Sequence, residues 1–105
     1  MKKNNFSIYY ANDIKSHLQV IDRKYWKEIK NKIEEQLLHE PDSESKNRKP
    51  LSKPPIDDRW ELRCGPQNIF RIFYKIDYLN YEVHILAIGV KIKEKLYIGK
   101  KEIKL

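Results

Sequence analysis

Charged side chains interrupt two neighbouring apolar runs of this sequence. The stretch WELRCGPQNIFRIFY, residues 60–74, carries Glu61, Arg63 and Arg71 among aromatic and aliphatic residues. Arginine offers a planar fork of donors that fits carboxylates and phosphates, and a carboxylate can accept a proton. If these side chains share one face of a sheet, that face could bind an anion. It could also be an ordinary solvated surface.

The spacing of the two apolar runs predicts how these charges meet. Alternation turns Cys64 inward and Arg63 outward on the first strand, and Phe70 inward and Arg71 outward on the second. A three-residue connection, residues 66–68, would pair Cys64 with Phe70 and place the two arginines directly opposite each other. Like charges in that arrangement are unfavourable, so a counter-anion is expected. It could be the neighbouring glutamate, an acidic partner or a phosphate.

The whole chain is basic. Its 105 residues include 22 Lys and Arg against 15 Asp and Glu, for a formal net charge of +7. The last fifteen residues hold six lysines and two glutamates, so more than half of that excess lies at the C-terminal end. This balance favours acidic or polyanionic partners. The length predicts a single domain over residues 1–105.

Cysteine and histidine usage excludes some chemistry. The single cysteine, Cys64, rules out an internal disulfide, and the histidines have no zinc-ligand spacing to one another or to the cysteine. We therefore expect no metal, no cofactor and a cytoplasmic location. The longest apolar run, ILAIGV, is far too short to cross a membrane, and the N-terminus has no signal-peptide pattern.

Strand and helix patterns together predict an α+β fold, in which a small, mostly antiparallel sheet packs against an N-terminal helical hairpin. The predicted helices are Asp13–Ile21 and Asp22–Leu38, and the predicted strands are Phe6–Tyr10, Trp60–Cys64, Ile69–Ile76 and Tyr81–Val90. The predicted core is Trp26, Ile29, Ile33, Leu62, Ile72, Leu86 and Ile88.

The last predicted strand is apolar on both alternating faces, which is typical of a central strand covered on each side. His84 within it is expected to be a packed or hydrogen-bonded core histidine without a functional role. Residues 39–58 hold four of the five prolines and few apolar residues, which predicts a surface loop whose second half is basic. In that loop, only Leu51 is expected to be anchored.

The order of these features resembles the RelE/ParE superfamily of toxins from type II toxin-antitoxin systems. The resemblance runs from Phe6 to about Tyr97, and it depends on order and spacing because no single short motif is decisive. The matching positions are Leu51, Leu62, Arg63, Gly65, Arg71, Tyr74, Gly89 and Tyr97.

The resemblance implies a function and a set of site residues. RelE-type members are ribosome-dependent messenger RNA endonucleases, inactive while a cognate antitoxin protein is bound, and need no metal because the RNA's own 2′-hydroxyl attacks the phosphate. By position, Arg71 matches the arginine on the scissile phosphate, Lys91 a further catalytic cation, and Tyr97 a tyrosine for orientation or proton transfer. Glu61 replaces a family lysine and could act as a base. The RNA-binding positions implied are Arg59, Arg63, Lys93, Lys49 and Lys53.

Simpler interpretations remain open for the same residues. Tyr97 could pack its ring on the sheet, Glu61 could be the ion-pair partner of Arg63 or Arg71, and Lys91 could be a solvated tail residue. Two other functions also fit. The chain could be a ParE-like or degenerate relative that acts only by binding a protein, or a small RNA-binding domain that stacks bases on exposed aromatic rings.

Overall fold

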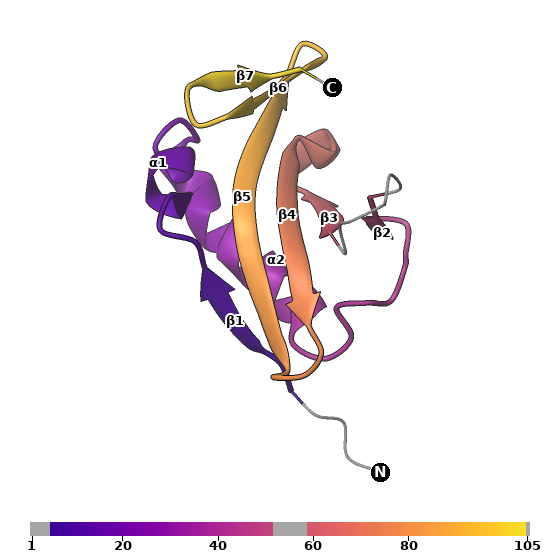
Figure 1. Cartoon of the computed structure of the whole chain (residues 1–105). Helices are drawn as coiled ribbons and strands as arrows, with labels where there is room; N and C mark the ends of the chain where they lie inside the picture. The colour runs from indigo at the N-terminus through magenta and orange to yellow at the C-terminus, as the bar shows by residue number, and fades with distance from the viewer. Residues whose placement is uncertain (1–4, 52–58, 105) are drawn as a thin grey trace.

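The computed structural model describes residues 5–51 and 59–104 and contains one sheet with two helices (Figure 1). The helices are α1 (Ile14–Leu18) and α2 (Trp26–Leu37). The strands are β1 (Ser7–Tyr10), β2 (Arg48–Pro50), β3 (Arg59–Cys64), β4 (Phe70–Asp77), β5 (Glu82–Ile92), β6 (Lys95–Ile98) and β7 (Lys101–Ile103).

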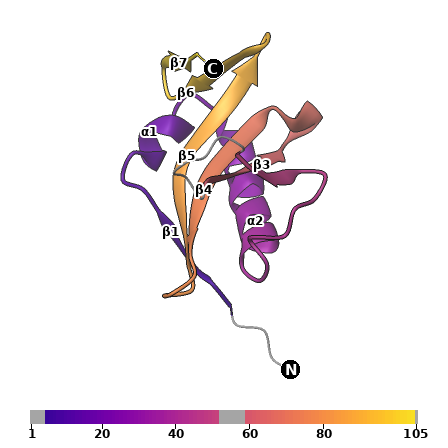
Figure 2. The same ribbon diagram turned by 45° about the vertical axis from the view of Figure 1, so that its right-hand side comes forward.

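The sheet runs in the order β2-β3-β4-β5-β6-β7, and every neighbouring pair in that order is antiparallel. Strand β1 joins β5 in parallel along the half of β5 that β6 does not cover. The α2 helix lies across one face of the sheet (Figures 1 and 2). The expected α+β class and the central position of residues 82–90 are confirmed.

The helical hairpin is less regular than predicted. The first helix is only five residues long, and α2 begins at Trp26 instead of Asp22. Asp22 accepts a hydrogen bond from the Lys24 backbone N–H at 3.1 Å and so caps a short 3-10 turn, Arg23–Tyr25, that leads into α2. A capping residue at position 22 therefore starts the second helical segment, but with a tighter turn than the periodicity suggests.

The α1 helix fills a gap along the edge of β5. Strand β1 pairs with β5 as far as Ile85, and β6 begins to pair at Gly89. Between them the Ile88 N–H donates to Nδ1 of His17 at 3.3 Å. A side chain from α1 thus satisfies a backbone donor of β5 that neither strand reaches.

The core lies between α2 and the inward face of the sheet. Ile29, Ile33 and Leu37 are buried on α2 at helical spacing. They belong to one cluster with the inward residues of β3, β4 and β5: Leu62, Cys64, Phe70, Ile72, Tyr74, Ile76, Val83, Ile85, Ile88 and Val90.

Two of the predicted core residues are not fully buried. Trp26 packs against the edge of the core and donates from Nε1 to the Ile21 carbonyl at 2.9 Å. Leu86 is half-buried, so its assignment to the core is wrong. A bulge causes this, because Phe73 pairs with Ala87 whereas Tyr74 pairs with Ile85, and Leu86 is left between the two pairs.

The bulge also explains why β5 is apolar at both odd and even positions. Before it, Val83 and Ile85 face the helices; after it, Ile88 and Val90 do. The inward face thus changes parity within a single strand. The helices cover only one side of β5. Apolar residues at both odd and even positions therefore do not mean that β5 is covered on both sides, as the sequence suggested.

Two segments in which the sequence predicted no strand contain strands. Residues 48–50, within the predicted surface loop, pair with β3 as a short edge strand that ends in Pro50. Arg48 of this strand donates from Nη1 to the carbonyls of Gln36 and Glu40, both at 2.7 Å, and so satisfies acceptors at the end of α2. The C-terminal tail forms the β6–β7 hairpin.

The predicted register of the β3–β4 hairpin is confirmed. Cys64 pairs with Phe70, and Arg63 pairs with Arg71. The connection begins at Gly65, whose φ of +84° lies in the region that favours glycine. A Cβ atom at this position would also collide with the ring of Phe70, which is fully buried.

We expect Gly65→Ala to destabilise the protein by about 3 kcal/mol or more, since a positive φ and an overpacked core each cost about 1–3 kcal/mol. Gly99→Ala is the matched control, because Gly99 also has a positive φ, +62°, but its nearest neighbours to an added Cβ are 3.8 Å away. That change should cost only about 1 kcal/mol. Urea denaturation measures both, and equal losses would contradict the steric account of Gly65.

Candidate functional site

The charged residues on the outward face of β3 and β4 line a hollow of about 480 Å³. Outward positions of β3 and β4 form its floor, and the β5 end with the β6–β7 hairpin supplies the rest. The lining residues are Leu51, Glu61, Arg63, Arg71, Phe73, Lys91, Glu94, Lys95, Leu96, Glu102, Ile103 and Lys104.

Glu61 lies between the two opposed arginines. One carboxylate oxygen, Oε2, is 3.2 Å from Nη1 of Arg71, and the other, Oε1, is 3.6 Å from Nη2 of Arg63. Glu61 is only 6% exposed. Of the three counter-anions that the sequence left open, the structure therefore provides the glutamate, and this offsets the cost of two cations in direct cross-strand register.

Arg71 is held from a second direction as well. Its Nε donates to the Asn68 carbonyl at 3.2 Å, and the Lys91 backbone N–H donates to the Ile69 carbonyl at 2.8 Å. Gln67 and Asn68 both have positive φ values in this connection. The tight turn after Gly65 thus supplies the carbonyls that fix Arg71 and join β4 to the end of β5.

A second, smaller hollow of about 320 Å³ lies beside the first. It is lined by Gln67, Asn68, Ile69, Arg71, Lys91, Lys93 and Glu94. Arg71, Lys91 and Glu94 line both hollows, whereas Glu61 lines only the larger one and Lys93 only the smaller one. The smaller hollow therefore combines three cationic side chains with a single acidic one.

The turn between β5 and β6 places Lys93. Ile92 pairs with Lys95, so Lys93 and Glu94 form a two-residue hairpin turn, and both have positive φ. Such values are uncommon for residues other than glycine. This conformation keeps the charged turn next to Lys91 and Arg71.

Tyr97 lies on the other side of the sheet from these cations. It pairs with Val90, an inward-facing residue, and its ring packs against the core. Tyr97 is not among the described residues that line the two hollows. The packing interpretation of Tyr97 therefore fits the structure, whereas a place beside Arg71 does not.

The remaining predicted RNA-binding residues lie outside the hollows. Arg59 is exposed at the start of β3, opposite Lys75, and Lys49 is exposed on β2, opposite Glu61. Both therefore share the outward face with the site without lining it. Lys53 falls outside the described residues.

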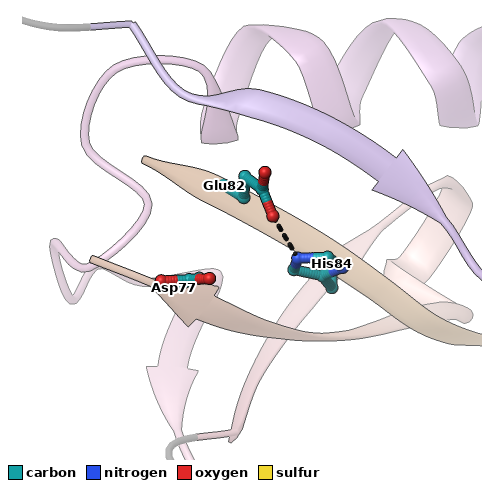
Figure 3. A group of neighbouring side chains, drawn as sticks. All are labelled: Asp77, Glu82 and His84. Atoms are coloured by element: carbon teal, nitrogen blue, oxygen red, sulfur yellow. Dashed lines mark hydrogen bonds and ion pairs between the residues drawn. The ribbon is translucent and has the colours of Figure 1, made fainter. Parts of the chain in front are cut away.

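Possible metal ligands also gather where β4 ends and β5 begins (Figure 3). Asp77 ends β4, and Glu82 and His84 lie on β5, with one ligand atom of each within 4.8 Å of the others. Protein donors already serve both carboxylates: Asp77 accepts from the backbone and side chain of Asn80 at 3.1 and 2.9 Å, and Glu82 lies 2.9 Å from Nε2 of His84. These contacts account for the cluster without a metal.

Sequence reasoning missed this cluster because it compared His84 only with the other histidines. Two signals were available, namely the spacing of Glu82 and His84 by two residues on one strand and the position of Asp77 just before a tight turn. His84 itself is hydrogen-bonded, as expected, but it lies on the outward face stacked on Tyr9 instead of in the core.

An apolar hollow of about 410 Å³ lies on the helix side of the protein. Its walls come from α1, α2, β1 and β5, with two lysines among them. The lining residues are Tyr10, Ile14, Leu18, Trp26, Lys27, Ile29, Lys30, Ile33 and Ile88. The sequence assigned four of these to the core, of which Ile29, Ile33 and Ile88 are buried and Trp26 is partly exposed. Periodicity alone could not reveal the hollow beside them.

The buried position of Cys64 makes its thiol unreactive. It is 4% exposed on the inward face of β3. Burial, together with the negative charge of Glu28, raises the pKa of its thiol to about 11. Because the thiolate is the reactive form, Cys64 is not suited to nucleophilic chemistry.

Comparison with known proteins identifies the fold. No protein-family model matches the sequence, and a comparison with curated proteins gives no significant match. Among solved structures, the chain is similar to one in the toxin-antitoxin complex RelBE2 from Mycobacterium tuberculosis, with a TM-score of 0.63 and 16% identical residues. The similarity covers 83% of this chain and 99% of that one. The RelE-like α+β fold expected from the sequence is therefore confirmed.

None of the described helices is long and apolar enough to cross a membrane.

We expect the native protein to react with a disulfide reagent at pH 8 at least about a hundredfold more slowly than the urea-unfolded chain, since a pKa two units higher lowers the thiolate fraction by that factor. Absorbance after addition of Ellman's reagent measures the rate, and free glutathione serves as the reference. Equal rates for native and unfolded protein would contradict the assignment of Cys64 to the core.

Proposed function

We propose that this protein is the toxin of a toxin-antitoxin pair and that it cleaves messenger RNA on the ribosome. One observation carries the proposal: Arg71 and Lys91 line both hollows of the outward face, and Lys93 lines the smaller one with them. Three cations from two strands and a turn thus meet at one concave patch. The sequence resemblance and the RelE-like fold agree with this function.

The reaction requires charge stabilisation above all. When a ribose 2′-hydroxyl attacks the adjacent phosphate, negative charge builds up on the phosphoryl oxygens, and fixed cationic donors lower the barrier. Arg71 is suited to this because its Nε donates to the Asn68 carbonyl, which fixes its guanidinium group. Lys91 and Lys93 add positive charge beside Arg71. The reaction needs no metal.

The phosphate is assigned to the smaller hollow. That hollow includes Arg71, Lys91 and Lys93 but not Glu61, whose carboxylate would repel a phosphate beside it. The strand would then continue over the larger hollow, where the half-buried ring of Phe73 is available for contact with a base or a ribose. Arg63, Arg59, Lys49 and Lys53 are proposed to contact the RNA backbone, and the cytoplasm is the proposed location.

The apolar hollow is the proposed antitoxin site. It lies on the helix side, its walls are almost entirely hydrophobic, and Lys27 and Lys30 stand among them. An amphipathic helix with apolar residues on one face and acidic residues beside them fits this combination. The RelBE2 complex contains a toxin and an antitoxin. A cognate antitoxin is therefore the proposed partner of this chain.

A second function, protein binding without catalysis, is favoured by two observations. A buried glutamate stands where RNA-cleaving relatives are expected to have a lysine, and Tyr97 packs against the core instead of joining the cations. A ParE-like or degenerate toxin would keep the apolar hollow and the fold but would not depend on Arg71. Cleavage assays on ribosomes distinguish the two functions.

We expect Arg71→Ala to lower ribosome-dependent cleavage by roughly a hundredfold to a thousandfold, the usual cost of removing one charge-stabilising contact. The Lys91→Ala, Lys93→Ala double variant should fall by at least as much. Lys75→Ala is the matched control, because Lys75 is exposed on the same outward face but lines neither hollow.

Primer extension on purified translating ribosomes measures cleavage, and growth arrest on induced expression measures toxicity. Circular dichroism verifies that each variant is folded. Wild-type toxicity in both the Arg71 variant and the double lysine variant would refute the nuclease function and leave protein binding as the explanation.

We also expect the association rate with the antitoxin to fall by about tenfold or more from low to high salt, because opposite charges speed encounter. Reversing the charge of the two lysines of the apolar hollow, by Lys27→Glu and Lys30→Glu, should slow association at low salt and weaken the dependence of the rate on salt. Lys75→Glu, on the outward face, should change neither if the helix side is the binding site. Stopped-flow measurements decide the matter, and a salt-independent rate for the wild type would exclude electrostatic steering.

A further inference from the structure

Among the described residues, Glu61 is the only buried charged one. It lies between Arg63 and Arg71 on the outward face. Both of its oxygens lie within ion-pair distance of an arginine, Oε2 with Arg71 and Oε1 with Arg63. A single carboxylate thus takes up donors of both guanidinium groups that the register places side by side. The free protein already holds an anion where two opposed arginines would otherwise attract one.

This arrangement affects any phosphate that binds at Arg71. The guanidinium group has donors on more than one side, so a phosphate in the smaller hollow can bind while Glu61 keeps its contact in the larger one. The two anions then share one cation. At the effective dielectric constant of a protein surface, their repulsion changes a binding constant by about tenfold.

We propose that Glu61 is an internal counter-anion that lowers the affinity of the outward face for phosphate groups. In the free protein it offsets one of the two positive charges of the opposed arginines. The same repulsion acts on a free phosphate and on the phosphate of an RNA strand at this position, so Glu61 weakens the binding of both.

This inference builds on the proposed function, because it takes Arg71 as the phosphate-binding residue. It differs from a role for Glu61 as a mere positioning group. A positioning group would be needed for anion binding, so that its loss would weaken binding. An internal counter-anion opposes binding, so that its loss strengthens it.

The test is the binding of inorganic phosphate and of a short RNA whose 2′-hydroxyls are replaced by hydrogen, so that it cannot be cleaved. Titrations followed by ¹H–¹⁵N NMR at one pH give the dissociation constants. We expect Glu61→Gln to bind phosphate about tenfold more tightly than the wild type, and to bind the RNA strand more tightly as well. Glu35→Gln, which removes the same charge from the exposed surface of α2, should leave both constants unchanged.

A second variant covers the case in which two arginines without a carboxylate unfold the hairpin. In Glu61→Gln, Arg63→Gln the net charge equals that of the wild type, but Arg71 no longer shares its donors with a carboxylate. This variant should also bind phosphate more tightly than the wild type. The same spectra report whether each variant is folded.

The outcomes separate the inference from the proposed function. If neither Glu61 variant binds phosphate more tightly than the wild type, whereas Arg71→Ala weakens binding, the counter-anion role is wrong and the phosphate site stands. If Arg71→Ala leaves phosphate and RNA binding unchanged, the site itself is wrong, and the inference is overturned with it.

Discussion

The opposed pair of arginines on β3 and β4 is the constraint on which the outward face depends. The turn that starts at Gly65 sets a register in which Arg63 lies across from Arg71, and this places two cations side by side on one surface. Like charges directly opposite each other destabilise a sheet, and an anion between them offsets this cost. Glu61, on the same strand as Arg63, supplies it and is buried as a result.

The rest of the site follows from how neighbouring segments approach this pair. The turn that fixes the register also provides the Asn68 and Ile69 carbonyls, which bind the Arg71 side chain and the Lys91 backbone. Strand β5 continues beyond β4 into the hairpin with β6, so that Lys91 of the strand and Lys93 of the turn reach the same patch. On the other face, the bulge at Leu86 lets β5 turn apolar residues toward the core both before it, at Val83 and Ile85, and after it, at Ile88 and Val90. One side of the sheet is thus free for chemistry because the other side holds the core.

Features that depend on local patterns could be predicted from the sequence, and those that depend on where segments meet could not. The alternation of side chains along the strands was enough to predict that Arg63 pairs with Arg71. The helical period of α2 was enough to predict that Ile29 and Ile33 are buried. The bulge that removes Leu86 from the core is invisible to a strict alternation. The edge strand β2 was missed because prolines and charges are typical of loops. The sequence left two roles open for Tyr97, because the side of the sheet on which it lies depends on its pairing with Val90.

The central claim is that Arg71 and Lys91 hold one phosphate of an RNA strand on the outward face of the sheet. A crystal structure with a short, 2′-deoxy-substituted RNA bound tests it most directly. The account predicts a phosphate within hydrogen-bond distance of the Arg71 guanidinium and the Lys91 ammonium groups, in the smaller hollow, with the Arg71 contact to Glu61 retained. An RNA strand seated on the helix side, or one that reaches neither Arg71 nor Lys91, would contradict it.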